Sequence, residues 1–244
     1  MSGPLLSVRQ VSKAFGGIQA LAGVDLELAR NEKLGVIGPN GSGKTTLLNV
    51  LSGVYRPDTG SVFFEDGDIT SLPAYKRTGL GIARTFQIPR PFWNLSVLDN
   101  VRTAIMYQPS SRKARGKGVD DRELAVNQLA KVGLESKSQV RPKELTQVDM
   151  RRLELGRALA TGPKLLLLDE VMAGLTPSEV DEVLKLLEAL NAEGVAFIMV
   201  EHIMEATMSF CDKVEVLSEG KEIVRGTPEE VVNDDEVVRV YLGE

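Results

Sequence analysis

A glycine-rich segment that ends in a lysine and two threonines constrains the fold of this chain more than any other feature. Residues 38–46 read GPNGSGKTT and satisfy the pattern G-x-x-x-x-G-K-[ST] of a phosphate-binding loop. The segment 33–37, apolar after Lys33, precedes this loop, and Leu47, Leu48 and Leu51 follow it at helical spacing. We therefore expect a buried strand, a loop and a helix, which is the setting in which this pattern binds a nucleoside triphosphate.

The residue types of the loop suit a phosphate. Glycines let backbone N–H groups close around the ligand, because no Cβ stands in the way, and the helix start adds partial positive charge. Lys44 is expected to reach the β- and γ-phosphates, and the Thr45 hydroxyl to ligate Mg²⁺. The predicted nucleotide-binding residues of this loop are Gly38, Pro39, Asn40, Gly41, Ser42, Gly43, Lys44, Thr45 and Thr46.

Two further apolar runs end in residues that can do chemistry. Residues 165–168 and 196–200 are continuous apolar segments, as in central parallel strands that are covered on both faces. Asp169 and Glu170 follow the first run, and His202 follows the second, so all three are expected at the carboxyl edge of one sheet, where such sheets bind ligands. We predict that Asp169 holds Mg²⁺, that Glu170 is the general base, and that His202 hydrogen-bonds the γ-phosphate.

Gln87 and Phe15 are weaker candidates on their residue type alone. Gln87 ends another short strand and can reach Mg²⁺ or the attacking water. Phe15 precedes a Gly-Gly turn, where its ring either stacks on an adenine or packs into the core.

The order of the segments predicts an α/β protein. Alternating apolar residues before and after the loop indicate an antiparallel β-layer, and helical periodicity runs from Pro89 to about Ala160. We expect one domain over residues 1–244, in which residues 1–87 and 161–244 form the nucleotide-binding core with its β-layer and residues 88–160 form an inserted helical subdomain. Within the insert, the basic segment 108–121 is interpreted as a solvated loop or, less favoured, as a site for acidic headgroups.

Composition narrows the class of protein. The net charge is −5 and no basic stripe is interleaved with aromatic residues, which argues against a nucleic-acid partner. The sequence holds no apolar run of membrane-spanning length and no signal-peptide pattern at its N-terminus. Cys211 is the single cysteine, so we expect no internal disulfide and a cytosolic location.

The order of these motifs resembles the ATPase domain of ABC transporters over essentially the whole chain. Residues 38–46 are similar to its Walker A motif, Gln87 to its Q-loop, 145–157 to its signature, 165–170 to its Walker B motif and His202 to its H-loop. The resemblance implies a P-loop NTPase (RecA-like) core with an antiparallel β-subdomain and an inserted helical subdomain, and it implies ATP and Mg²⁺ as cofactors. It also implies that Phe15 stacks on adenine and that residues 173–176 form the D-loop.

Softer motifs resemble one subfamily. Residues 83–87 (ARTFQ), 94–101 (NLSVLDNV) and 226–230 (GTPEE) are similar to the ATPases of branched-chain amino-acid importers, although urea and short-amide importers share much of this pattern. This resemblance implies a peripheral protein at the cytoplasmic face of the membrane, with two permease subunits, a second ATPase subunit and, indirectly, a periplasmic or extracellular binding protein. The two rival interpretations are a soluble ABC-type ATPase that remodels nucleic acid or ribosomes, and a phosphoryl-transfer kinase.

The aromatic segment 86–95 has two interpretations. It holds Phe86, Phe92, Trp93 and Leu95, a composition typical of partner-binding patches. It is also compatible with a locally buried helix start.

The signature departs from the family pattern. Where the family has L-S-G-G-Q, this chain has Leu145, Thr146, Gln147, Val148 and Asp149, and Val171 replaces the usual proline after Glu170. We expect the side chains of Gln147 and Val148 to obstruct the approach of a partner's γ-phosphate, and the Asp149 carboxylate to repel it. The sequence therefore favours a heterodimer, whose partner carries an intact signature.

Overall fold

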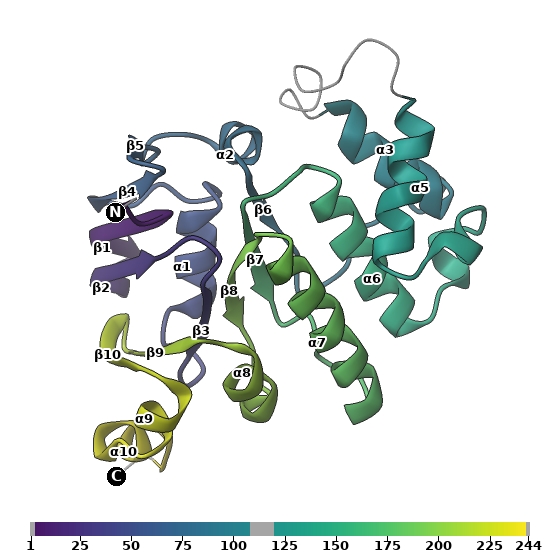
Figure 1. Cartoon of the computed structure of the whole chain (residues 1–244). Coiled ribbons are helices and arrows are strands. Elements are labelled where there is room, and N and C mark those ends of the chain that lie inside the picture. Colours follow the sequence, from purple (N-terminus) through teal and green to yellow (C-terminus); the bar gives the residue numbers. More distant parts are fainter. Residues whose placement is uncertain (1–2, 108–119, 243–244) are drawn as a thin grey trace.

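The computed structural model describes residues 3–107 and 120–242, so most of the basic segment 108–121 lies outside the described residues. Two sheets form the centre of the fold (Figure 1). The four-stranded antiparallel sheet has the order β2-β1-β4-β5, and the six-stranded sheet has the order β10-β9-β3-β8-β7-β6. The first consists of β1 (Leu6–Phe15), β2 (Ile18–Leu28), β4 (Thr59–Phe64) and β5 (Gly67–Asp68); the second of β3 (Lys33–Ile37), β6 (Ile82–Arg84), β7 (Leu165–Asp169), β8 (Ala196–Val200), β9 (Lys213–Ser218) and β10 (Lys221–Gly226).

Helix α1 (Lys44–Leu51) lies between the two sheets. Its Leu47, Leu48 and Leu51 are fully buried and share one apolar core with residues of both sheets. Burial of this face stabilises the helix far more than the propensity of an eight-residue segment could. The phosphate loop is therefore fixed at its far end by the core of the protein.

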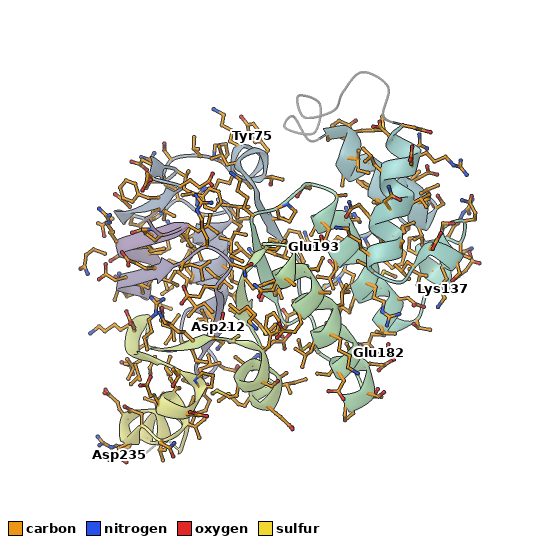
Figure 2. The ribbon with its side chains drawn as sticks, viewed as in Figure 1. Tyr75, Lys137, Glu182, Glu193, Asp212 and Asp235 are labelled. Atoms are coloured by element: carbon orange, nitrogen blue, oxygen red, sulfur yellow. The ribbon has the colours of Figure 1, made fainter. Side chains whose placement is uncertain are left out.

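Helices cover the opposite face of the six-stranded sheet. One apolar core joins α7 (Pro177–Ala192) and α8 (Met204–Phe210) with the helices α3 (Val97–Tyr107), α5 (Asp121–Lys131) and α6 (Gln147–Leu159), which lie together on one side of the molecule. Thr176 caps α7, as expected, and accepts a hydrogen bond from the Glu179 N–H. Along this helix Val183 and Leu187 are buried, whereas Glu182 reaches into solvent, as does Glu193 at its end (Figure 2).

The smaller elements complete the chain. They are α2 (Ala74–Leu80), which the sequence did not predict, the short helices η1 (Glu135–Lys137) and η2 (Pro142–Glu144), and α9 (Pro228–Val232) and α10 (Asp235–Leu242) at the C-terminal end. Within the described ranges, no helix is long and apolar enough to cross a membrane.

Strand order explains why residues far apart in sequence meet. Strand β8 pairs in parallel with both β3 and β7, so the loops that follow these three strands leave the sheet at the same edge. The phosphate loop follows β3, Glu170 follows β7, and Glu201 and His202 follow β8. The predicted α/β class and the antiparallel β-layer are confirmed.

Candidate nucleotide-binding site

A polar hollow of about 190 Å³ lies at this edge. Its walls combine one segment of the phosphate loop with the residues that end β7 and β8. The lining residues are Ala20, Asn40, Gly41, Ser42, Gly43, Lys44, Thr45, Thr46, Glu170 and His202. The structure thus brings most of the predicted phosphate-binding residues together with Glu170 and His202.

Two loop glycines are required by the protein itself. A Cβ at Gly38 would lie 2.0 Å from the carbonyl oxygen of Leu217, and one at Gly43 would lie 2.4 Å from that of Ala20. Gly43 also has φ +106°, which L side chains rarely adopt. Gly41, in contrast, has open space where a Cβ would stand, which leaves room for a ligand.

Lys44 is held inside its own loop. Its Nζ donates to the carbonyl oxygens of Gly38 at 2.8 Å and of Pro39 at 2.9 Å. Burial lowers the pKa of Lys44 below its ordinary value, and the nearby Glu170 acts in the opposite direction. Lys44 is one of the residues that line the hollow, where an anionic ligand would favour its charged form.

Glu170 is oriented by two other predicted site residues. Its Oε1 lies 2.9 Å from Nε2 of His202, and its Oε2 accepts a hydrogen bond from Nε2 of Gln87. Glu170 also has φ +49°, an uncommon conformation for a residue with a side chain. The carboxylate is thus fixed at the wall of the hollow by side chains from two other segments.

Asp169 is buried beneath this wall. Its Oδ2 accepts a hydrogen bond from Nη2 of Arg84 at 2.7 Å, and Arg84 also donates to Asn49 at 2.7 Å. Among the residues that the structure describes, no three His, Cys, Asp or Glu side chains gather to hold a metal. The predicted Mg²⁺ ligands Thr45, Gln87 and Asp169 offer a hydroxyl, an amide and a carboxylate oxygen, which fits the preference of this hard cation.

Phe15 lies outside the hollow. Its ring is 42% exposed at the end of β1 and meets Tyr55 edge-on, with 5.1 Å between ring centroids. An exposed ring at this place is not a core residue, so the alternative of a packed core position is wrong. One face of an exposed aromatic ring is the surface on which an adenine can stack.

Helix α6 holds the segment that carries Gln87. Arg151 donates from Nη1 to the carbonyl oxygen of Gln87 at 2.8 Å, and Arg157 donates to that of Arg90 at 2.7 Å. Between them, burial raises the pKa of Glu154 to about 7, although Arg151 and Arg157 oppose the shift. The signature helix and the Q-loop segment are therefore tied together through backbone carbonyls.

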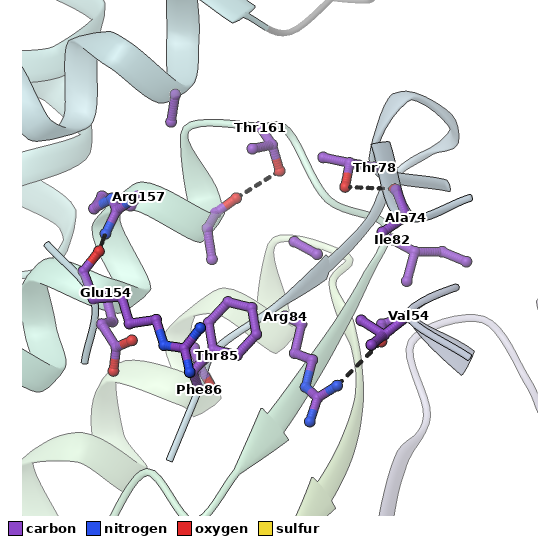
Figure 3. Close-up of a pocket in the computed structure, with 15 residues that line it drawn as sticks. Val54, Ala74, Thr78, Ile82, Arg84, Thr85, Phe86, Glu154, Arg157 and Thr161 are labelled. Carbon is purple, nitrogen blue, oxygen red and sulfur yellow. Dashed lines mark hydrogen bonds between the residues drawn. The ribbon is translucent and has the colours of Figure 1, made fainter. Parts of the chain in front are cut away.

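A groove lies beside this segment. Its volume is about 290 Å³, and it runs between Val54, Ala74 and Ile82 on the core side and Phe86, Glu154 and Arg157 on the helical side (Figure 3). The segment next to it is exposed: Ile88 by 71%, Phe92 by 45% and Trp93 by 54%. The interpretation of Trp93 as part of a locally buried helix start is therefore wrong.

The first turn of α6 corrects one expectation about the signature. The Asp149 carboxylate does not face outward: its Oδ2 accepts from the Thr146 hydroxyl at 2.8 Å and from Lys137, and the residue is buried. Burial alone would raise the pKa of Asp149, but these hydrogen bonds hold it below its ordinary value. The expected repulsion of a phosphate by Asp149 is thus largely neutralised by Lys137, whereas the Thr146 hydroxyl is already engaged.

Gln147 and Val148 are engaged as well. The side-chain Nε2 of Gln147 donates to the carbonyl oxygen of Ala173 at 3.1 Å, and Val148 packs against the apolar core. The sequence suggested that both side chains lie free over the start of the helix. In the structure they contact the protein instead. The Cβ atoms remain where the family pattern has glycines.

The comparisons with known proteins agree with this geometry. A family model described as "ABC transporter" matches residues 21–173, more than half of the chain. The chain belongs to the ABC transporter family. This membership makes it an ATPase, as the sequence predicted. A second model, described as "Branched-chain amino acid ATP-binding cassette transporter", matches residues 221–244 at the end of this ABC protein.

Similarity to individual relatives covers almost the whole of this ABC ATPase. The high-affinity branched-chain amino acid transport ATP-binding protein LivG of Escherichia coli (strain K12) is 36% identical over 257 residues, with both chains fully covered. The lipopolysaccharide export system ATP-binding protein LptB of Acidithiobacillus ferridurans is 33% identical over 240 residues, covering 98% of this chain and 97% of LptB. A crystal structure of a nucleotide-free ATP-binding cassette from an ABC transporter superposes with a TM-score of 0.88 at 31% identity, covering 99% of this chain and all of the other.

Three residues of the site escaped the sequence prediction. Arg84 holds Asp169, Arg151 holds the Gln87 carbonyl, and Glu201 accepts from the Met172 N–H. Arg84 lies three residues before Gln87, and Glu201 directly precedes His202. Closeness in sequence to a predicted site residue could therefore have indicated both.

Proposed function

We propose that this ABC ATPase binds and hydrolyses ATP to power an importer for branched-chain or other hydrophobic amino acids. The observation that carries this proposal is the match of residues 221–244 to the branched-chain amino acid cassette model, beside full-length similarity to LivG. The similarity to LptB, whose name refers to lipopolysaccharide export, is taken as similarity of the ATPase alone. Uptake of labelled leucine by cells that carry or lack this subunit tests the substrate class.

The hydrolytic step is assigned to residues of the polar hollow. Lys44 and the N–H groups of the phosphate loop bind the β- and γ-phosphates, while Phe15, outside the hollow, stacks on the adenine. Glu170 orients a water and accepts its proton while the water oxygen attacks the γ-phosphorus. The bond to the bridging oxygen breaks and leaves ADP and phosphate, and His202 donates a hydrogen bond toward the γ-phosphate.

Mg²⁺ is part of the proposal. Thr45, Gln87 and Asp169 would hold it, and it would neutralise charge on the phosphate oxygens. Arg84 orients Asp169 for that role, since its guanidinium occupies one carboxylate oxygen only.

The groove beside Gln87 is assigned to the two permease subunits. Exposed aromatic residues with arginines beneath them are typical of protein interfaces, and Arg157 lies 5.1 Å from the centre of the Phe92 ring. Docking there would place this ATPase at the cytoplasmic face of the membrane. Phe86 lines the groove, and the next residue, Gln87, contacts Glu170. These two residues would therefore connect a partner in the groove to the general base.

Replacing Trp93 by Ala is expected to reduce co-purification with the permease subunits and to leave ATP binding unchanged. Trp93 is more than half exposed. Its replacement should therefore not lower the free energy of unfolding by the roughly 3–5 kcal/mol that truncation of a buried aromatic residue costs. Pull-down from detergent-solubilised membranes, together with a melting curve, measures both effects.

Val232→Ala is the matched control for this experiment. Val232 has the same exposed fraction of 54% but lies on α9, on the other side of the molecule from the helices α3, α5 and α6 (Figure 1). Equal permease capture by the wild type and the Trp93 variant would reject the docking surface.

We also propose that the second ATPase subunit is a different chain. The Thr146 hydroxyl donates to Asp149, and Cβ atoms stand at 147 and 148, so the first turn of α6 offers little to a partner's γ-phosphate. A homodimer would carry this weakened end at both ATP sites. A partner with an intact L-S-G-G-Q helix would complete the site built from Lys44, Glu170 and His202.

Size-exclusion chromatography of the isolated chain with the Glu170→Gln change and ATP tests this. We expect a monomer. The triple change Gln147→Gly, Val148→Gly and Asp149→Gln gives residues 145–149 the sequence L-T-G-G-Q, with both family glycines, and should create an ATP-dependent homodimer. A tight homodimer without the triple change, or homodimer turnover equal to that of the complete transporter, would overturn the asymmetric arrangement.

A further inference from the structure

Glu201 is a buried acid to which the proposed hydrolytic step gives no role. It directly follows β8 and is only 3% exposed. Its Oε1 accepts the backbone N–H of Met172 at 2.9 Å, and its carboxylate also accepts the backbone N–H of His202. One side chain therefore bonds the backbone of two loops at the edge of the hollow.

Both of these loops carry a residue of the site. Met172 stands two residues after Glu170, and His202 is itself a wall residue. The Glu170 N–H donates to the carbonyl oxygen of Val200 on β8 at 2.9 Å. The segment 170–172 is therefore bonded at two points, by Val200 at Glu170 and by Glu201 at Met172. Because Glu170 has φ +49°, its backbone keeps this conformation only while its surroundings fix it.

We infer that Glu201 is a positioning residue that fixes Glu170 and His202 relative to each other. It does not line the hollow, so it does not contact the reacting atoms. It acts by fixing the backbone at Met172, two residues after Glu170, and at His202. The side chains of Glu170 and His202 meet 2.9 Å apart, so their separation depends on these two segments. This inference rests on the proposed role of Glu170 as the general base.

The role needs an acceptor oxygen and not a negative charge. Burial raises the pKa of Glu201 to about 7, and the nearby charge of Glu170 acts in the same direction. A neutral carboxyl or amide still presents a carbonyl oxygen to the Met172 N–H. Gln is therefore the conservative replacement, whereas Ala removes the acceptor and Asp withdraws it by one methylene.

The test compares steady-state ATP turnover of the assembled transporter with Glu201 replaced by Gln, Ala or Asp. We expect kcat to fall about 10–100-fold for Ala and Asp, because small displacements of a catalytic group cost rates of this order. The KM for ATP should stay within about 3-fold, since Lys44 and the phosphate loop are untouched, and the Gln variant should keep most of the wild-type kcat.

The same changes at Glu215 are the controls. Glu215 is fully buried on β9 and does not line the hollow, so Glu215→Ala reports the loss of a buried acid without a positioning role. Normal kcat in Glu201→Ala, or an equal loss in the Ala and Gln variants, would overturn the inference. If Glu170→Gln also turned over normally, the assignment of the general base would fail as well, which separates the two proposals.

Discussion

Glu170→Gln is expected to lower ATP turnover by about 10²–10⁴-fold, the usual contribution of a general acid or base. The amide has the size of the carboxylate but cannot accept a proton from water. Its contacts with Gln87 and His202 lie at one wall of the hollow, away from the glycines that bind phosphate, so ATP should still bind. Single-turnover hydrolysis and nucleotide binding, measured on the same preparation, separate the two steps.

Glu193→Gln provides the matched control for Glu170→Gln. Glu193 is an exposed acid at the end of α7 that pairs with Lys131 on α5, and it lies away from the hollow (Figure 2). It should turn over ATP like the wild type. Hydrolysis by Glu170→Gln at near-normal rates would remove Glu170 from the role of general base.

The outline of the fold follows from local sequence patterns. Residues 33–51 combine an apolar strand, a glycine-rich loop and an apolar helix, and each of these signals agrees with its neighbours. The apolar runs at 165–168 and 196–200 also predicted buried parallel strands, and the pairing of β8 with β7 and β3 bears this out. These two strands alone predicted that Glu170 and His202 lie at the same carboxyl edge of the sheet.

What the sequence missed depends on side-chain direction. Asp149 was expected to face a phosphate, but a capping bond to Thr146 and an ion pair with Lys137 turn it into the protein. The partner that decides this direction lies on a different element, η1, so no local pattern reports it. Gln147 likewise turns to Ala173, a residue 26 positions away in sequence.

Buried polar partners are a second kind of omission. The pairing of Arg84 with Asp169 joins two strands that are 85 positions apart, and the motif patterns describe only Asp169. Glu201 belongs to the same kind: it follows an apolar strand, and its bond to Met172 becomes visible only when β7 and β8 lie side by side. A buried polar group needs a hydrogen-bond partner, and only the structure shows which residue that partner is.

Lys44→Ala is expected to weaken ATP binding itself, in contrast to Glu170→Gln. The lysine ammonium is the cation nearest to the phosphate site of the hollow, and a hydrogen bond to a charged group contributes about 1.5–3 kcal/mol, or about 10–150-fold in affinity. This group also donates to the carbonyl oxygens of Gly38 and Pro39, so its removal leaves those two acceptors without their donor.

Binding of a fluorescent ATP analogue to the isolated chain measures this loss, with Lys185→Ala on the exposed side of α7 as the control. Lys185 carries the same charge but does not line the hollow, so its loss should change affinity less than about 2-fold once salt screens distant charges. A melting curve of Lys44→Ala is needed to establish that the variant is folded, because the carbonyl oxygens of Gly38 and Pro39 have lost their donor. Unchanged ATP affinity in a folded Lys44→Ala protein would contradict the assignment of the whole nucleotide site, since no other lysine or arginine of the described residues lines the hollow.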